Sequence, residues 1–257
     1  MSPAKALDFE SPLAIRSYTL PEMLDRTKEL VGIMRRSSPE DLSKLMSISP
    51  ALGELNFERF QDWGLPFTPA DARPAVLAFN GDTYQGMAAG RQFSTRDFTQ
   101  AQKVLRILSG LHGVLRPLDL IKPYRLEMGS KVRHPGGGDL YSFWGTTVSD
   151  RLRGDIEASP GPKVLVNLAS KEYFGVVQPD RLDAPVVAPV FLDAQGDGEL
   201  RIVSFFAKRA RGTMAGWVVR NRVSSVKALN DFDIDGYRFD PSRSSRNAPV
   251  FTRRTAA

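Results

Sequence analysis

Two glycines, Gly110 and Gly113, stand three positions apart between two apolar stretches, and Ser109 directly precedes the first of them. Glycine permits left-handed backbone and close approach, so backbone N–H groups in such a turn can converge on a phosphate oxygen. This is the arrangement of a helix-hairpin-helix element. His112 departs from the usual spacing of that element, and Pro117 interrupts the second helix early. A glycine C-cap leading into a tight turn explains the same residues equally well.

Basic residues form two groups that favour contact with phosphates. The first lies between Lys103 and Arg133, where only two acidic residues occur, and the second lies within 207–222, where none occurs. On a helix, the second group would fill most of the face opposite Ala210 and Met214, and such a face repels itself unless an anion binds. An ordinary solvated surface is the alternative. The residues expected to contact phosphate are Lys5, Arg106, Ser109, Gly110, Gly113, Arg116, Lys122, Arg125, Lys208, Arg209, Arg211, Arg220 and Arg222.

Polar residues also follow two predicted strands, around Asn80 and around Asn167. Polar groups just beyond buried strands often form sites in α/β proteins, although turn capping accounts for the same residues. They support a rival interpretation, an enzyme that acts on a nucleotide or another phosphorylated small molecule in the same cleft. Its candidate residues are Lys5, Asn80, Tyr84, Tyr124, Glu127, Asn167 and Glu172.

Composition narrows the classes of function. The 257 residues include no cysteine, which excludes disulfides, thiolate metal sites and thiol nucleophiles, and 35 basic against 29 acidic residues give a formal net charge of +6. Walker A, GxGxxG, HExxH and GxSxG sequences do not occur, and two histidines cannot form a multi-histidine metal site. We expect no metal site and no cofactor. Without an apolar leader or a spanning segment, we expect no membrane contact and a cytoplasmic location.

The elements that position these residues are helical in the first quarter of the chain. A capping box at Thr19 predicts one helix, Ser38 opens a second, and Ser49 a third that carries Leu52 and Leu55 on its apolar side. The apolar run 75–79 then predicts a buried strand.

A capping box at Ser94 predicts a helix that continues through Leu108. The Pro/Gly-rich segment 135–138 predicts a loop before a helix that carries Phe143, Trp144, Val148 and Leu152.

Further strands and one long helix are expected in the second half. The run 163–168 predicts a strand, and 186–192 with 200–206 predicts a β-hairpin, followed by a basic helix over 207–222. The segment 241–257 is basic and rich in Ser, Asn and Pro, which predicts a flexible tail. Since no repeat or long linker occurs, we expect residues 1–257 to form a single compact α+β domain, a mixed sheet with surrounding helices.

Several segments together resemble the peroxide stress protein YaaA family, in order and over nearly the whole chain. They are Ser2-Pro3-Ala4-Lys5, 77–86, 105–111, 115–121, 123–129, 167–170 and Ala207-Lys208-Arg209-Ala210-Arg211-Gly212. Members of this family usually begin with a short apolar strand before the first of these segments, so we expect a truncated start or a sheet without one edge. Lys171 and Gly175 also differ from the residues that the family more often has there.

The resemblance implies a compact mixed fold with a helix-hairpin-helix element and a concave, positively charged cleft that binds double-stranded DNA. It also implies a role in protecting cells from hydrogen peroxide by limiting free intracellular iron. The basic residues named above would then make the phosphate contacts, an assignment that rests on their charge and position.

Overall fold

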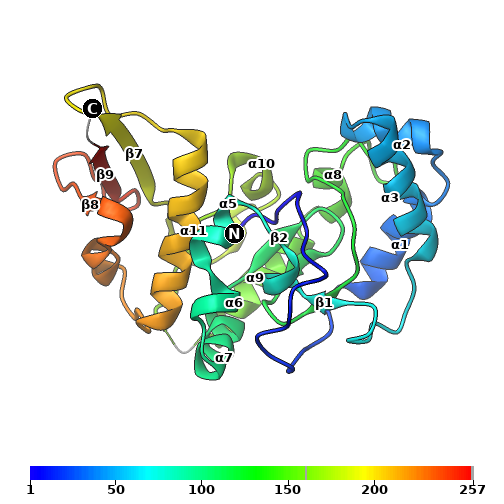
Figure 1. Cartoon of the computed structure of the whole chain (residues 1–257), viewed down its shortest axis with the longest axis horizontal. Helices are drawn as coiled ribbons and strands as arrows, with labels where there is room; N and C mark the ends of the chain where they lie inside the picture. The colour runs from blue at the N-terminus through cyan, green and yellow to red at the C-terminus, as the bar shows by residue number, and fades with distance from the viewer. Residues whose placement is uncertain (160, 256–257) are drawn as a thin grey trace.

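The computed structural model of the chain describes residues 1–159 and 161–255, and its architecture is mixed α+β, as the sequence predicts (Figure 1). Helices dominate and the strands are short. Most of its buried apolar side chains form one contiguous cluster that runs from Met1 to Phe251 and includes Trp144, Phe98 and Tyr237 among its largest members. The functional candidates are therefore positioned by helices and loops rather than by one large sheet.

The N-terminal helices form one arm of the molecule. They are α1 (Leu24–Met34), α2 (Pro39–Met46) and α3 (Pro50–Asp62). Ser38 accepts a hydrogen bond from the Asp41 N–H and Ser49 accepts one from the Leu52 N–H, so both predicted helix starts are confirmed. The predicted capping box at Thr19 is wrong, because its hydroxyl donates to Asp119 instead, at 2.6 Å.

α2 and α3 are joined by only three residues, 47–49. Ser47 adopts the left-handed conformation, with φ 50° and ψ 54°, and the N–H groups of Ser47 and Ile48 close the end of α2 on the carbonyls of Lys44 and Ser43. The result is a tight helical hairpin. Leu52 and Leu55 on α3 are exposed, so the predicted apolar side of this helix is wrong, and Gly53, Asn56 and Phe60 are buried instead.

The next segment lies between the two arms. Its elements are β1 (Arg73–Pro74), α4 (Ala75–Ala78), α5 (Asp82–Met87), α6 (Ala89–Gln92) and α7 (Thr95–Val104). The predicted strand over 75–79 is instead the short helix α4, because a brief apolar run does not distinguish a buried strand from a buried helical turn. The Ser94 capping box is confirmed, but α7 ends at Val104, before Leu108.

The two glycines belong to a β-hairpin. β2 (Ile107–Ser109) pairs antiparallel with β3 (Gly113–Leu115), so the helix-hairpin-helix element expected here is wrong. The apolar residues on both sides of the turn, which suggested two helices, supply two fully buried strands.

The middle of the chain adds short elements around this hairpin. They are β4 (Leu120–Ile121), α8 (Leu140–Trp144), α9 (Thr147–Ala158), β5 (Leu165–Val166), α10 (Lys171–Phe174), the 3-10 turn η1 (Pro179–Arg181) and β6 (Val186–Val187). The helix predicted after the 135–138 loop is two helices, separated at Gly145, where φ is +52°. The predicted strand over 163–168 is present but covers only Leu165–Val166.

The C-terminal part forms the second arm. It contains β7 (Val190–Gln195), α11 (Ser204–Arg220), the 3-10 turns η2 (Lys227–Asp231) and η3 (Ile234–Gly236), β8 (Arg238–Phe239) and β9 (Val250–Thr255). The basic helix is confirmed, but it begins at Ser204. The predicted β-hairpin is wrong, because β7 pairs in parallel with β9 and keeps only a single bridge, Asp193 to Arg201, with the segment expected as its partner.

The final strand corrects the expectation of a flexible tail. β9 is the middle strand of the β7–β9–β8 sheet, and Phe251 within it is fully buried. Residues 256–257 of the expected tail lie outside the described residues. The other described strands pair as β1 with β4, β2 with β3 and β5 with β6.

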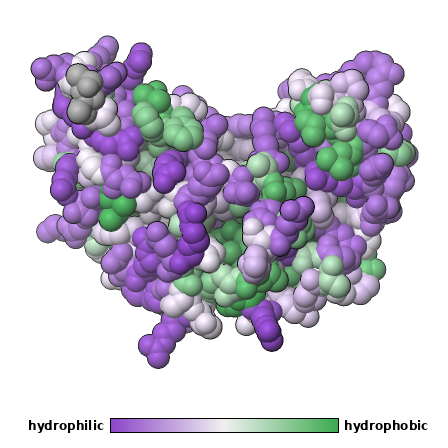
Figure 2. Space-filling view, viewed as in Figure 1, coloured by the Kyte–Doolittle hydropathy of each residue, from purple (hydrophilic) through white to green (hydrophobic). Residues whose placement is uncertain are grey.

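A hollow separates the two arms. In Figure 1, α1 to α3 stand on one side and the sheet of β7, β8 and β9 with the first turns of α11 on the other, while α10 lies between them. Figure 2 shows the same hollow at the surface, with hydrophilic side chains along much of its floor and a hydrophobic patch on each arm. Segments from both halves of the chain thus face one another across it.

Candidate functional site

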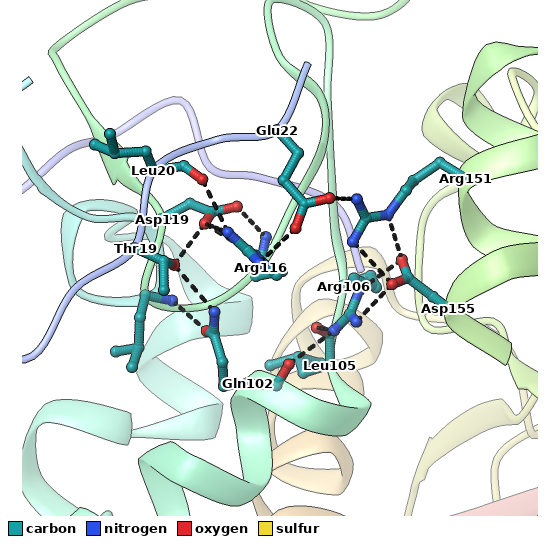
Figure 3. Close-up of polar contacts among 11 residues, drawn as sticks. Thr19, Leu20, Glu22, Gln102, Leu105, Arg106, Arg116, Asp119, Arg151 and Asp155 are labelled. Atoms are coloured by element: carbon teal, nitrogen blue, oxygen red, sulfur yellow. Dashed lines mark hydrogen bonds and ion pairs between the residues drawn. The ribbon is translucent and has the colours of Figure 1, made fainter. Parts of the chain in front are cut away.

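Arg106 and Arg116, two of the predicted phosphate contacts, belong to one network of ion pairs (Figure 3). Arg106 donates two hydrogen bonds to the Asp155 carboxylate, both at 2.8 Å, and Arg116 donates to Asp119 at 2.9 Å. Glu22 lies between them and pairs with Arg116 and with Arg151, and Arg151 in turn pairs with Asp155. The network joins the N-terminal segment, the end of α7 and α9.

The charges of this network balance. Three arginines face three carboxylates, and the Arg106 side chain is only 15% exposed. Burial by itself raises the pKa of the Asp155 carboxyl, yet hydrogen bonds from Arg106 and Arg151 bring it below its ordinary value. Because these cations already have partners, the arrangement holds segments together and offers little free charge to a phosphate.

Lys122 and Arg125 are also paired. The ammonium of Lys122 lies 2.7 Å from Asp71, which lowers the pKa of that carboxyl to about 2, and Arg125 lies 3.0 Å from Glu127. Glu127 accepts a second cation, Lys5, at 3.1 Å. The predicted phosphate contacts of the first group therefore all have carboxylate partners, and those of Arg106 and Lys122 lie far away in the sequence.

The residues of the glycine turn are buried. Ser109 shares a 2.6 Å hydrogen bond with the Tyr124 hydroxyl and accepts one from the His112 N–H. The Gly110 carbonyl accepts from the Trp144 indole, and a Cβ on Gly113 would meet Trp144 and Met23 at 2.8 Å. The glycines are needed for close packing inside the molecule, so this turn does not present its N–H groups to a ligand.

The cations of α11 are in a different situation. Lys208 and Arg209 are exposed, and neither forms an ion pair with a residue of 1–159 or 161–255. Burial lowers the pKa of the half-buried Arg211 guanidinium, which likewise has no carboxylate partner within that part of the chain. At the other end of the helix, Arg222 pairs with Asp97 at 2.8 Å and Arg220 donates to Gln92. Within α11, the cations without a carboxylate or amide partner among the described residues are therefore Lys208, Arg209 and Arg211, in its first two turns.

A second group of candidates meets near the middle of the molecule. Lys5, Tyr124 and Glu127 line a small cavity of about 20 Å³, together with Tyr173 and Arg125. Sequence reasoning missed Tyr173, although it directly follows the candidate Glu172. This cavity has about the volume that one water molecule requires.

Of the other candidates of the enzyme interpretation, two lie near this cavity and two lie away from it. Tyr84 lies close by and donates to the Ser2 carbonyl at 3.0 Å, and Glu172 accepts from the Gly129 N–H at 3.1 Å. Asn80 and Asn167 do not line this cavity. Asn80 is exposed, and Asn167 accepts from the Ala169 N–H and borders a different pocket.

Burial controls the chemistry of the tyrosines in this group. It raises the pKa of Tyr84, Tyr124 and Tyr173, so all three keep their hydroxyl protons at neutral pH. Lys5 is 65% exposed and can change partners, whereas Arg125 is mostly covered. With two cations and one carboxylate, the group favours a small anion over a cation.

A larger pocket, of about 200 Å³, lies elsewhere. It is mainly apolar, between β2 and β5, and α9 and α11 supply Leu152, Ile156 and Val219 to its lining. Of the predicted site residues only Arg106 and Asn167 border it. Its lining offers few groups for catalysis, and the sequence pattern gave no sign of it.

Within residues 1–159 and 161–255, no three His, Asp or Glu side chains come together as a metal site would require. None of the helices in the described part of the chain is long and apolar enough to span a bilayer.

The sequence matches known proteins over nearly its whole length. The family described as peroxide stress protein YaaA matches residues 1–243. A UPF0246 protein of Cellvibrio japonicus (strain Ueda107) is 49% identical over 253 residues, which cover 98% of this chain and 97% of that relative. A match of this length and identity includes both arms and the polar group between them, and the chain therefore belongs to the peroxide stress protein YaaA family.

Proposed function

We propose that this protein binds duplex DNA through phosphate contacts in the hollow between its two arms, as part of the cellular response to hydrogen peroxide. The family description supports the link to peroxide. One observation carries the proposal of DNA binding: Lys208 and Arg209 on α11 are exposed and have no carboxylate partner among the described residues. No cofactor is needed for such contacts, and limiting free intracellular iron would be the wider role.

The helical hairpin of α2 and α3 supports the same proposal from the opposite arm. Its turn places exposed Ser47 and Ser49 beside the N-terminus of α3, where the helix dipole favours a phosphate. In a helix-hairpin-helix element, backbone groups contact phosphates without reading bases. We assign that part to α2 and α3 in place of the buried β2–β3 turn.

The test is the affinity for a fluorescently labelled duplex, measured by anisotropy at low salt. Lys208→Gln with Arg209→Gln should weaken binding about tenfold or more, because two charge-assisted contacts are lost. Arg106→Gln is the matched control, since its charge is already paired with Asp155, and its affinity should stay close to wild type. Equal affinities for the double variant and the wild type would refute the proposal.

A second candidate function is binding of a small phosphorylated molecule, with or without catalysis. It is favoured by the meeting of Lys5, Tyr124 and Glu127 around the small cavity, with Arg125 alongside. The cavity would have to widen, and the exposed Lys5 side chain is the group able to move. A screen of nucleotides and phosphorylated metabolites should then raise the melting temperature of the wild type but not of Lys5→Gln. No stabilising compound at millimolar concentration would argue against this function.

A further inference from the structure

Three large apolar side chains are exposed where α11 begins. Ile202 is 61% exposed, Phe205 51% and Phe206 36%. Phe206 is partly covered, since the Arg253 guanidinium lies 4.6 Å from the centre of its ring, and the two phenyl rings meet edge to face at 5.6 Å. Phe205 is therefore the more exposed ring of the pair, next to a Phe206 ring that already packs against Arg253.

Phe205 shares its helix face with the free cations. Lys208 follows it by three positions and Arg209 by four, the spacing that places side chains side by side on a helix. Further along the same face the helix is covered by α5, where Gly212 lies against the Thr83 carbonyl. The exposed part of the face is thus one aromatic ring with two unpaired positive charges next to it.

This combination fits a nucleic acid better than a protein partner. Lysine is depleted at protein interfaces, whereas proteins that hold nucleobases place aromatic rings beside cations that follow the phosphates. Residues 200–222 include no acidic side chain that could neutralise this charge. Figure 2 shows a hydrophobic patch beside hydrophilic side chains on this arm, at the edge of the hollow.

We infer that Phe205 stacks on a nucleobase, which it partly unstacks from its neighbour, while Lys208 and Arg209 hold the adjacent phosphates. The inference rests on the proposed DNA binding and adds to it a contact with bases that charge alone would not make. Apolar wedges of this kind open a base step in duplex DNA, and stacking on aromatic rings depends little on sequence.

The test uses short duplexes that carry 2-aminopurine, a base whose fluorescence rises on unstacking, at one of several central positions. Wild-type protein should raise the fluorescence at one or more positions. Phe205→Ala should abolish the rise and weaken binding by about 5- to 150-fold, the measured range for losing one stacked base. Phe205→Trp should retain the fluorescence rise and the affinity. Phe205→Leu, which keeps an apolar side chain without a ring, should lose both.

Tyr18→Ala removes an aromatic side chain of similar exposure, 48%, from the N-terminal segment and serves as the control. It should leave the fluorescence signal unchanged. Tight binding by the wild type without any fluorescence rise, or a rise that survives in Phe205→Ala, would overturn the inference and leave the proposed function intact. Failure of the wild type to bind any of the duplexes at low salt would overturn both.

Discussion

Arg106 and Lys208 carry the same charge in different surroundings. Arg106 shares two hydrogen bonds with Asp155, which lies 49 positions further along the chain, while Lys208 faces solvent. Residue types and local spacing identified both as candidates for phosphate contact. The distinction between them depends on a partner from α9, and that partner is fixed by packing rather than by sequence neighbours. The same holds for Lys122 with Asp71 and for Lys5 with Glu127.

The buried side chain of His112 predicts a dependence of folding stability on pH. It is fully buried between the rings of Phe67 and Tyr124, its Nδ1 lies 3.2 Å from the Thr27 hydroxyl, and its Nε2 has no hydrogen-bond partner in the described part of the chain. Burial lowers the pKa of His112 from 6.5 to about 3. The unfolded chain therefore binds the proton more readily than the folded one.

The folded state should lose stability as the pH falls below 6.5, and the loss should continue until about pH 3. Between pH 7.5 and 5.5 this one group should lower the free energy of unfolding by about 1.4 kcal/mol. Urea unfolding of the wild type and of His112→Phe at both pH values measures the effect. The difference between the two proteins should change by that amount, and a difference independent of pH would show that His112 titrates normally.

The crossing of α5 and α11 is the element that presents the cationic face. It depends on small residues: a Cβ added at Gly212 would lie 1.6 Å from the Thr83 carbonyl oxygen, and one added at Gly86 would lie 2.2 Å from the Arg209 carbonyl oxygen. The helix backbones therefore approach more closely than any other residue permits. The sequence showed a basic helix here but not what its small residues pack against.

Gly212→Ala should force this crossing apart and cost about 3 kcal/mol or more, as a severe overpacking. Gly154→Ala in α9 is the matched control, because no atom lies within 4 Å of the added Cβ, and it should stabilise by about 0.5 to 1 kcal/mol. Thermal unfolding of both variants checks the prediction. Equal small effects at the two positions would contradict the tight crossing.

Elements defined by local signals were predictable and those defined by distant pairing were not. The starts of α2, α3 and α7 follow from Ser38, Ser49 and Ser94, whose side chains accept hydrogen bonds within the same turn. β7 instead finds its partner in β9, close to the end of the chain, so its neighbour in sequence was the wrong choice. The β2–β3 turn was misassigned because its glycines are required by tertiary contacts with Trp144 and Leu126.

At the scale of the whole molecule, the hollow brings together surfaces that are far apart in the sequence. One side carries the α2–α3 hairpin and the other the first turns of α11 (Figures 1 and 2). The mixed α+β class was accessible from local helix and strand signals, and the family from segments spread along the chain. The relative placement of the arms was not, because it results from many small contacts between short elements.

The most direct test of DNA binding in this hollow is the salt dependence of the affinity. The logarithm of the binding constant for duplex DNA should fall linearly with the logarithm of salt concentration, by about 0.9 for each phosphate that a cation neutralises. Replacing Lys208 and Arg209 with glutamine should make this slope shallower by about 1.8, while Arg106→Gln should leave it unchanged. A slope that is the same in the wild type and the double variant would contradict the account.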